Sequence, residues 1–203
     1  IYCTQSGLDI AASWFLHNEA TTAHGGGIRL FSATSVFIAG TVFADNSSYY
    51  AGGAIECNES DPTITNCTIV RNSTTHFGGG IYMYSSDPVI SNTIIAFQSQ
   101  QHALYCDDWI ENPTISHCVV YQNAGGDSLC GTYHDNVFTE DPRFCNMPDG
   151  DFSLCDNSFC LPENNSWTEL VGALGSGGCG DCNAPVEAAS WGAIKALYRG
   201  RRR

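Results

Sequence analysis

The sequence predicts an all-β fold, a single-stranded parallel β-helix of about five coils, on the basis of three observations. One sequence motif recurs through the first half of the 203-residue chain. Within each copy apolar and polar residues alternate with a period of two, and glycine or polar residues interrupt the alternation. A repeat of this size indicates stacked units that share one core. The copies occupy residues 25–46, 52–72, 78–98 and 105–123, after a partial copy that ends at residue 18.

Apolar residues occupy equivalent positions in the copies, and each copy follows the last at a nearly constant spacing. One series is Ile10, Ile38, Ile64, Ile90 and Ile115. A second series with the same steps is Phe15, Phe43, Ile69, Ile95 and Val120. A third, shorter series is Ile28, Ile55 and Ile81. These spacings predict that equivalent side chains lie over one another inside a coiled chain.

The alternation around these positions predicts about three short strands per repeat, because successive strand side chains point to opposite faces. Ile55 and Cys57, for example, share one face. One such repeat cannot bury its apolar face alone, whereas coiling pairs each strand in parallel with its equivalent about 4.8 Å away. Leucine-rich repeats are shorter and propeller blades are longer, so neither fits.

Residues at the predicted corners have the required conformational properties. Glycines precede the strands that begin near Ile28, Ile55 and Ile81, where a sharp bend needs a positive φ or a close backbone approach. An Asp-Pro pair precedes another strand at 61–62 and again at 87–88. A polar amide recurs at a further corner and predicts a stacked column that satisfies turn backbone groups. Its members are Asn18, Asn46, Asn72, Gln98 and Asn123.

The phrase I-x-N-C-T-I-x-x-N…G-G-G-I, at residues 64–81, resembles the right-handed parallel β-helix (pectate-lyase-like) superfamily. That superfamily includes pectin-active enzymes and repeat modules of exported bacterial surface proteins. The resemblance covers residues 1 to about 124. It implies a right-handed coil, in agreement with the general preference for right-handed crossovers.

Three regions are expected: β-helix repeats over 1–124, irregular final coils and a cap over 125–182, and a helical, basic tail over 183–203. The segments Asp141-Pro-Arg-Phe, Gly150-Asp-Phe and Cys160-Leu-Pro resemble the endings of exported bacterial β-helix proteins, and that resemblance implies aromatic residues that plug the core. The tail resembles a short sorting or anchoring tag of secreted bacterial proteins. A helix packed on the cap or loosely tethered is the competing interpretation.

Composition limits the partners and the compartment. Residues 1–190 contain three basic side chains against all 21 acidic ones, so the body repels nucleic acid and anionic polymers but could attract cations or neutral sugars. Eleven cysteines indicate an oxidising compartment and therefore a secreted or cell-surface protein. No apolar stretch is long enough for a transmembrane helix. The chain opens at Ile1 inside a repeat, which suggests a processed or truncated product.

Candidate catalytic residues are few. Lyases on this scaffold need an arginine or lysine base, and the body offers only three arginines. Asp107 and Asp108 faintly resemble the paired aspartates of β-helix glycoside hydrolases, although the other motifs of that family are absent. An acidic loop in a decayed repeat is the favoured interpretation of this pair.

Three residues are candidate ligand-binding residues: Tyr50, His76 and His102. His76 and His102 lie four positions after the amide corner, as does Tyr50, so they would stack about 5 Å apart as a ladder for sugar rings or a weak metal site. A space-filling column of loop residues is the favoured alternative. No resident cofactor is predicted. A Ca²⁺ site is conceivable because several carboxylates crowd one side of neighbouring coils, but a solvated acidic face fits better. These carboxylates are Glu56, Glu59, Asp61 and Asp87.

Seven cysteines are candidates for disulfides. Cys106 and Cys130, which are separated by about one repeat, could bridge adjacent coils, and three others could staple the cap: Cys145, Cys155 and Cys160. Cys179-Gly-Asp-Cys182 could be redox-active, half a zinc site or part of a cap disulfide, and a structural disulfide or separate pairings are favoured.

The favoured function is therefore non-catalytic: a rigid surface module for carbohydrate binding, adhesion or surface-layer structure, with another surface protein as a second class of partner. Self-association through the ends or sides of the coil is conceivable. The alternative is a polysaccharide-active hydrolase or lyase that uses the outer β-helix face.

Overall fold

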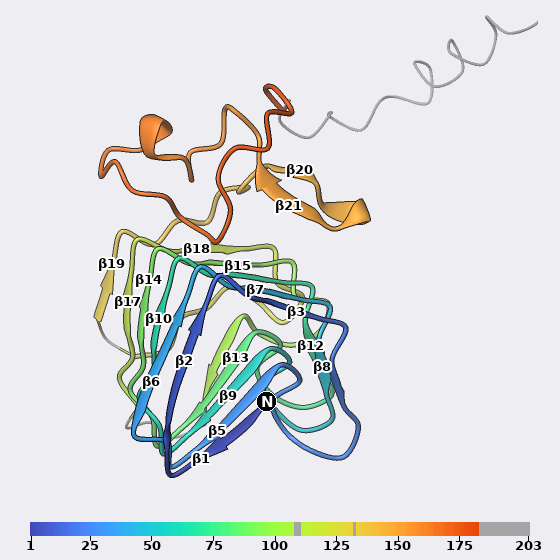
Figure 1. Cartoon of the computed structure of the whole chain (residues 1–203), viewed down its shortest axis with the longest axis vertical. Helices are drawn as coiled ribbons and strands as arrows, with labels where there is room; N and C mark the ends of the chain where they lie inside the picture. Colours follow the sequence, from blue (N-terminus) through green and yellow to red (C-terminus); the bar gives the residue numbers. More distant parts are fainter. Residues whose placement is uncertain (108–110, 132, 183–203) are drawn as a thin grey trace, which may run out of the picture.

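The period-two strands of each repeat form three parallel sheets that run along the axis of a β-helix (Figure 1). The computed structural model describes residues 1–107, 111–131 and 133–182. Sheet A consists of β1 (Tyr2–Thr4), β5 (Ile28–Phe31), β9 (Ile55–Asn58), β13 (Ile81–Tyr84) and β16 (Leu104–Cys106). Sheet B consists of β2 (Gly7–Ala11), β6 (Ser35–Ala39), β10 (Thr63–Thr65), β14 (Val89–Ser91), β17 (Thr114–Ser116) and β19 (Tyr133–Asp135).

Sheet C consists of β3 (Trp14–Leu16), β7 (Val42–Ala44), β11 (Thr68–Val70), β15 (Ile94–Ala96) and β18 (Val119–Tyr121). A fourth, short sheet D, which the sequence did not predict, is formed by β4 (Glu19–Ala20), β8 (Ser47–Ser48) and β12 (Ser73–Thr74). In the three coils that contain these strands, sheet D lies between sheet C and the corner that precedes sheet A.

The strand register confirms the predicted ladders. Ile64 pairs with Ile38 on one side and with Ile90 on the other, and all three side chains have no exposed surface. Sheet C aligns Phe43 with Ile69 in the same way, and sheet A aligns Ile28 with Ile55 and Ile55 with Ile81. These inward side chains form one core along the axis.

Glycine is required at the corner that leads into sheet A. Gly52 has a φ of 65°, in the left-handed region, and a Cβ on it would lie 2.3 Å from the carbonyl oxygen of Ile55. A Cβ on the next residue, Gly53, would lie 2.2 Å from the carbonyl oxygen of Gly79 in the following coil. The glycines therefore allow neighbouring coils to approach within hydrogen-bonding distance.

The predicted amide column is a continuous hydrogen-bonded ladder at the end of sheet C. Each side-chain oxygen accepts a hydrogen bond of 2.8–3.0 Å from the backbone N–H of the member one coil earlier, from Asn18 through to Asn123. Asn46 and Asn72 also donate through their side-chain nitrogens to carbonyl groups of sheet C. The ladder satisfies buried backbone groups that a turn leaves without partners.

Residues 125–131 and 133–138 belong to a last, irregular coil. β19 extends sheet B beyond β17, and Leu129, Cys130 and Val137 pack against the end of the inner core. The region after it contains an antiparallel pair, β20 (Phe144–Asn146) and β21 (Asp151–Leu154), and two short 3-10 helices, η1 (Met147–Asp149) and η2 (Pro162–Asn164). We call residues 139–182 the cap.

The cap covers a flank of the β-helix, and the expectation that its aromatic residues plug the axial core is wrong. In Figure 1 the orange and red cap lies beside the strands of sheet C, not beyond β19. Phe152 packs on Val42, Ala44 and Val70, which point outward from sheet C and are fully buried or nearly so. The outer face of sheet C is apolar, and burying it favours a second core over a plug at the end.

Arg71 fastens the cap to the flank. Its Nε and Nη2 atoms lie 2.9 and 2.5 Å from the two carboxylate oxygens of Asp45 in the neighbouring coil. Its Nη1 atom donates to the carbonyl oxygen of Met147, and its guanidinium lies 5.0 Å from the ring centroid of Phe152. The predicted tail, 183–203, lies outside the described residues. Among the helices of the described ranges, none has the length and apolarity needed to span a bilayer.

Candidate functional site

The outer surface of sheet A carries polar and aromatic side chains, in contrast to the apolar outer surface of sheet C. Strand alternation sends every second residue outward, and in-register pairing aligns these residues in rows along the axis. One row contains Tyr2, Arg29, Glu56, Tyr82 and Tyr105, and the next contains Thr4, Phe31, Asn58 and Tyr84. We call these residues, together with Asp107 directly after β16, the sheet A face.

Glu56 lies at the centre of the first row and has no exposed surface. Its Oε2 atom is 2.8 Å from Nε of Arg29, and its Oε1 atom is 3.1 Å from Nδ1 of His24. Both contacts are within ion-pair distance, but their angles do not meet the geometry of a hydrogen bond. The side chains of Arg29 and His24 are each 31% exposed, so the carboxylate lies one layer of side chains below solvent.

Burial shifts the protonation equilibria of this cluster. It raises the pKa of Glu56 to about 7, although the positive charge of Arg29 acts in the opposite direction. Burial also lowers the pKa of His24, and repulsion from Arg29 lowers it further. Near neutral pH Glu56 is therefore divided between its charged and neutral forms, and His24 is mainly neutral.

Tyr82 connects the first row to Asp107. Its hydroxyl donates a 2.8 Å hydrogen bond to Oδ2 of Asp107. Burial and this hydrogen bond raise the pKa of Tyr82, so the hydroxyl keeps its proton. The structure thus places Asp107, one of the two candidate catalytic carboxylates, at the end of the sheet A face. Asp108, the other, lies outside the described residues.

A column of stacked rings borders the sheet A face at the preceding corner. The ring centroids of His24 and Tyr50 are 5.2 Å apart with planes 9° from parallel, and those of Tyr50 and His76 are 5.1 Å apart with planes 21° from parallel. The expected spacing of Tyr50 and His76 is therefore present. Sequence reasoning missed His24, although its position one repeat before Tyr50 was a signal for it.

The column continues into the sheet A face. Phe77 lies beside His76, with ring centroids 6.1 Å apart, and its ring is 4.9 Å from that of Tyr105. His102, the third candidate ligand-binding residue, contacts Tyr105 at a centroid distance of 6.4 Å. Among the described residues no ring contact joins His102 to His76, so the expected stack of three is wrong for His102, which meets the sheet A face through Tyr105 instead. Their role in binding stays a prediction.

Stacking determines which part of each ring a ligand can reach. The faces of Tyr50 are covered by His24 and His76, so the ring edge, which carries the hydroxyl, is the part left for contact. Nδ1 of His76 lies 2.9 Å from the carbonyl oxygen of Tyr49 and donates to it, so Nε2 is the acceptor in the neutral ring. The column is suited to hydrogen bonding with hydroxyl groups rather than to stacking against sugar rings.

A shallow depression of about 240 Å³ lies on the sheet D side of the same column. It is lined by hydroxyl groups of serine and threonine and by Tyr49, whose ring contacts both Tyr50 and His76 edge-on. Other lining residues are Glu19, Ser47, Ser73, Thr75 and Gln100. Polar contacts are therefore available on both sides of the column.

The four carboxylates considered for Ca²⁺ do not form one solvated group. Glu56 is buried against Arg29. A carboxylate oxygen of Glu59 accepts a hydrogen bond of 2.8 Å from Ser32, and one of Asp61 accepts a hydrogen bond of 2.7 Å from the backbone N–H of Asp87. These partners tie the acidic residues to turns of neighbouring coils. The Ca²⁺ site stays a prediction.

Three disulfides are present in the described chain, and they join Cys106 to Cys130, Cys145 to Cys179 and Cys155 to Cys182. The first is the pairing that sequence spacing suggested. Cys179 and Cys182 of the C-x-x-C motif thus have separate partners. Cys160, expected among the residues that staple the cap, is a buried free thiol that packs with Leu161 against sheet C.

A family model described as the right-handed beta helix region matches residues 12–142. The chain therefore belongs to this family, and the right-handed parallel β-helix expected from its repeat motif is confirmed. No curated protein and no solved structure matches the chain.

Proposed function

We propose that this protein is a secreted or cell-surface β-helix module that binds neutral carbohydrate through the sheet A face without chemical turnover. The observation that carries the proposal is the continuous aromatic and polar surface from His24 through Tyr50 and His76 to Tyr105. Binding sites of this composition use aromatic rings for apolar contact and a few polar groups for orientation.

The rings and the polar groups have separate roles. Tyr84 and Phe77, exposed by 36% and 39%, offer apolar surface to the C–H groups of a sugar. The edges of Tyr50 and His76 offer hydrogen bonds to its hydroxyl groups, as do Asn58 and Asp107 of the sheet A face. The ring column recurs over three coils, from His24 to Tyr50 and His76, so its edges present similar contacts along the axis and suit an extended chain of sugars.

Charge and disulfides support the type of ligand and the compartment. The 21 acidic side chains outnumber the eight basic ones, and the resulting field disfavours polyanions such as acidic polysaccharides and nucleic acid. The disulfides favour an oxidising compartment outside the cytoplasm.

The test is binding of the purified protein to an array of neutral and acidic glycans, followed by titration of the best ligand into variants. Tyr84→Ala and Tyr50→Ala should each weaken binding roughly tenfold, since an aromatic side chain at an interface contributes about 1–2 kcal/mol. Phe37→Ala is the matched control, because Phe37 is 45% exposed on sheet B, away from the site. Selective binding of acidic glycans, or equal losses in all three variants, would contradict the proposal.

A polysaccharide hydrolase is the second candidate, and the protonation state of Glu56 is the observation that favours it. A carboxyl group with a pKa near 7 can act as a general acid at neutral pH. Its complete burial argues against direct contact with a substrate. Turnover of neutral polysaccharide or polygalacturonate that Asp107→Asn, Asp108→Asn or Glu56→Gln abolishes would replace the binding module with an enzyme.

Adhesion to another surface protein and self-association are further proposals for the same module. Sedimentation at increasing protein concentration would detect self-association.

A further inference from the structure

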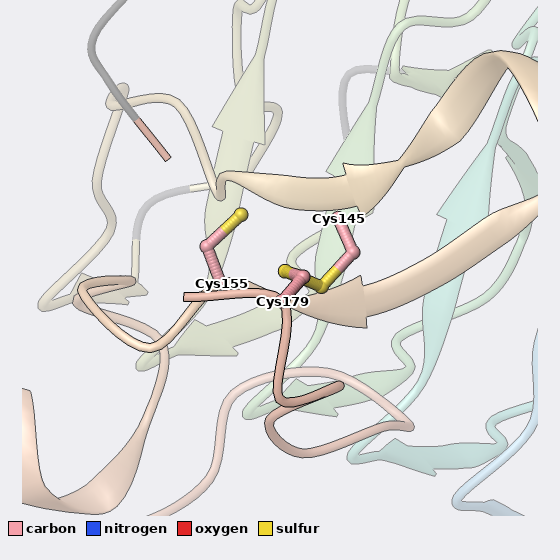
Figure 2. A group of neighbouring side chains, drawn as sticks. All are labelled: Cys145, Cys155 and Cys179. Atoms are coloured by element: carbon pink, nitrogen blue, oxygen red, sulfur yellow. A yellow bond between two sulfur atoms is a disulfide. The ribbon is translucent and has the colours of Figure 1, made fainter. Parts of the chain in front are cut away.

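Four cysteine sulfur atoms meet in the cap. Cys145 lies on β20, Cys155 directly follows β21, and Cys179 lies in the loop after them. Figure 2 shows the side chains of Cys145 and Cys179 joined by a disulfide, with Cys155 beside them. Their Sγ atoms all lie within 4.8 Å of one another. The fourth sulfur, that of Cys182, is bonded to Cys155 and so lies next to this group.

Hydrogen bonds that involve no sulfur hold the three segments together. The antiparallel pairing of β20 with β21 aligns Phe144 with Leu154, next to Cys145 and Cys155. Leu154 is bonded in turn to the loop, because its N–H donates to Gly175 and its carbonyl oxygen accepts from Gly177. The C-x-x-C segment is fixed by three further bonds: Asp156 N–H to Gly180, Cys182 N–H to Asn157, and Asn157 Nδ2 to Cys182. Because these bonds do not involve sulfur, they favour the same placement of the three segments after the disulfides are reduced.

A tetrahedral zinc site requires this arrangement of ligands. Four thiolates at about 2.3 Å from Zn²⁺ lie roughly 3.8 Å from one another, so after reduction the two sulfur atoms of each former disulfide need to move apart by about 1.8 Å. A C-x-x-C pair supplies two ligands, as in known structural zinc sites. The β20–β21 hairpin supplies the other two, which sequence spacing alone did not reveal. Asp156 and Asp181, next to Cys155 and Cys182, add negative charge that favours a cation.

We propose that the reduced cap binds one Zn²⁺ through Cys145, Cys155, Cys179 and Cys182, and that zinc binding and the two disulfides are alternative states of one site. Two equivalents of a phosphine reductant, each oxidised to its phosphine oxide with the oxygen of one water molecule, convert the two disulfides to four thiols. Zinc then displaces the four thiol protons to solvent. This inference does not depend on the carbohydrate site.

The five cysteines outside the three disulfides do not offer a competing metal site. The free cysteines are dispersed and buried: Cys3, Cys57, Cys67, Cys118 and Cys160. Burial raises the pKa of Cys67 to about 11 and that of Cys118 and Cys160 to about 12, and a thiolate is the metal-binding form. Exposed Cys179, in contrast, gives reductant and metal access to the cluster.

The test compares oxidised and phosphine-reduced protein. Reduced protein should bind one equivalent of zinc with a Kd below about 1 μM, and cobalt in place of zinc should give thiolate charge-transfer absorption. Oxidised protein should bind neither metal. The double variant Cys179→Ser/Cys182→Ser should lose binding, whereas Cys106→Ser/Cys130→Ser should keep it. If reduction loosens the cap, zinc should restore its resistance to chymotrypsin.

Three results would overturn the proposal. The first is reduced protein that binds no stoichiometric metal while its circular dichroism spectrum is unchanged. The second is metal binding that survives in Cys179→Ser/Cys182→Ser. The third is a loosened cap that zinc does not protect from chymotrypsin.

Discussion

Replacing Asn72 with alanine should destabilise the β-helix strongly, because Asn72 is buried at the centre of the amide ladder. Its Oδ1 atom accepts hydrogen bonds of 3.0 and 2.9 Å from the backbone and side-chain nitrogens of Asn46. Its Nδ2 atom donates to the carbonyl oxygens of Phe43 and Val70 at 3.0 and 3.1 Å. The methyl group of alanine can replace none of these bonds.

The expected loss in the free energy of unfolding is about 2–5 kcal/mol. The buried N–H of Asn46 loses its acceptor, and an unsatisfied buried group costs about 1–3 kcal/mol. The side-chain nitrogen of Asn46 keeps its bond to Phe15, and the carbonyl of Val70 keeps its bond from Asp45, so those losses are smaller. The remaining hydrogen bonds contribute about 0.5–1.5 kcal/mol each.

Asn18→Ala is the matched control. Asn18 occupies the exposed end of the same ladder, and its side chain donates one bond to Asn46, whose Oδ1 atom also accepts from the backbone of Asn18. The loss there should stay below about 1 kcal/mol. Urea unfolding followed by circular dichroism, together with hydrogen exchange of the sheet C amides, measures both variants. Equal losses in the two variants, or a loss below about 1 kcal/mol in Asn72→Ala, would refute the reasoning.

Two further predictions concern the cap and the Glu56 cluster. Arg71→Ala removes the ion pair with Asp45 and the contacts to η1 and β21. It should lower the free energy of opening of the cap, measured by hydrogen exchange, by about 1–3 kcal/mol and leave exchange in sheet B unchanged. Equal effects on the cap and on sheet B would contradict this prediction. Because Glu56 binds its proton more tightly when folded, its contribution to stability is largest below its unfolded pKa of 4.5 and falls as pH rises to about 7. As pH rises from 5 to 8, the free energy of unfolding of Glu56→Gln, measured with urea, should therefore increase by about 1–2 kcal/mol relative to that of wild type. This is less than the full pKa shift implies, because the site lies close to solvent. The lowered pKa of His24 makes stability rise with pH, but this contribution is common to wild type and variant and cancels in their difference. A difference in unfolding free energy between the two proteins that does not change with pH would contradict the prediction.

The repeat made the β-helix predictable because equivalent core positions in successive coils are occupied by similar apolar residues. Ile38, Ile64 and Ile90 have one environment, so one spacing determines three positions. The cap lacks such a period, and its position depends on long-range packing that no local pattern encodes. One signal was present in the sequence: Ile94 and Ala96 alternate with core residue Ile95, so this strand is apolar on both faces, as in a sheet covered on both sides.

The candidate site was only partly predictable, for a related reason. Tyr50 and His76 were found from their offset to the amide corner, and their ring stacking follows from the coil spacing. Glu56 was assigned to a solvated acidic face because its charge alone suggests exposure. Its burial depends on Arg29 of the preceding coil, whose side chain lies over it only after the coils stack.

The measurement that tests the account most directly is a hydrogen-exchange footprint of the protein with a neutral glycan selected from the array. The account predicts added protection at residues 24–31, 50–58, 76–84 and 102–107, which form the ring column and the sheet A face, and no change on sheet B. Protection confined to sheet B or to the cap would show that the ligand binds elsewhere and would contradict the account.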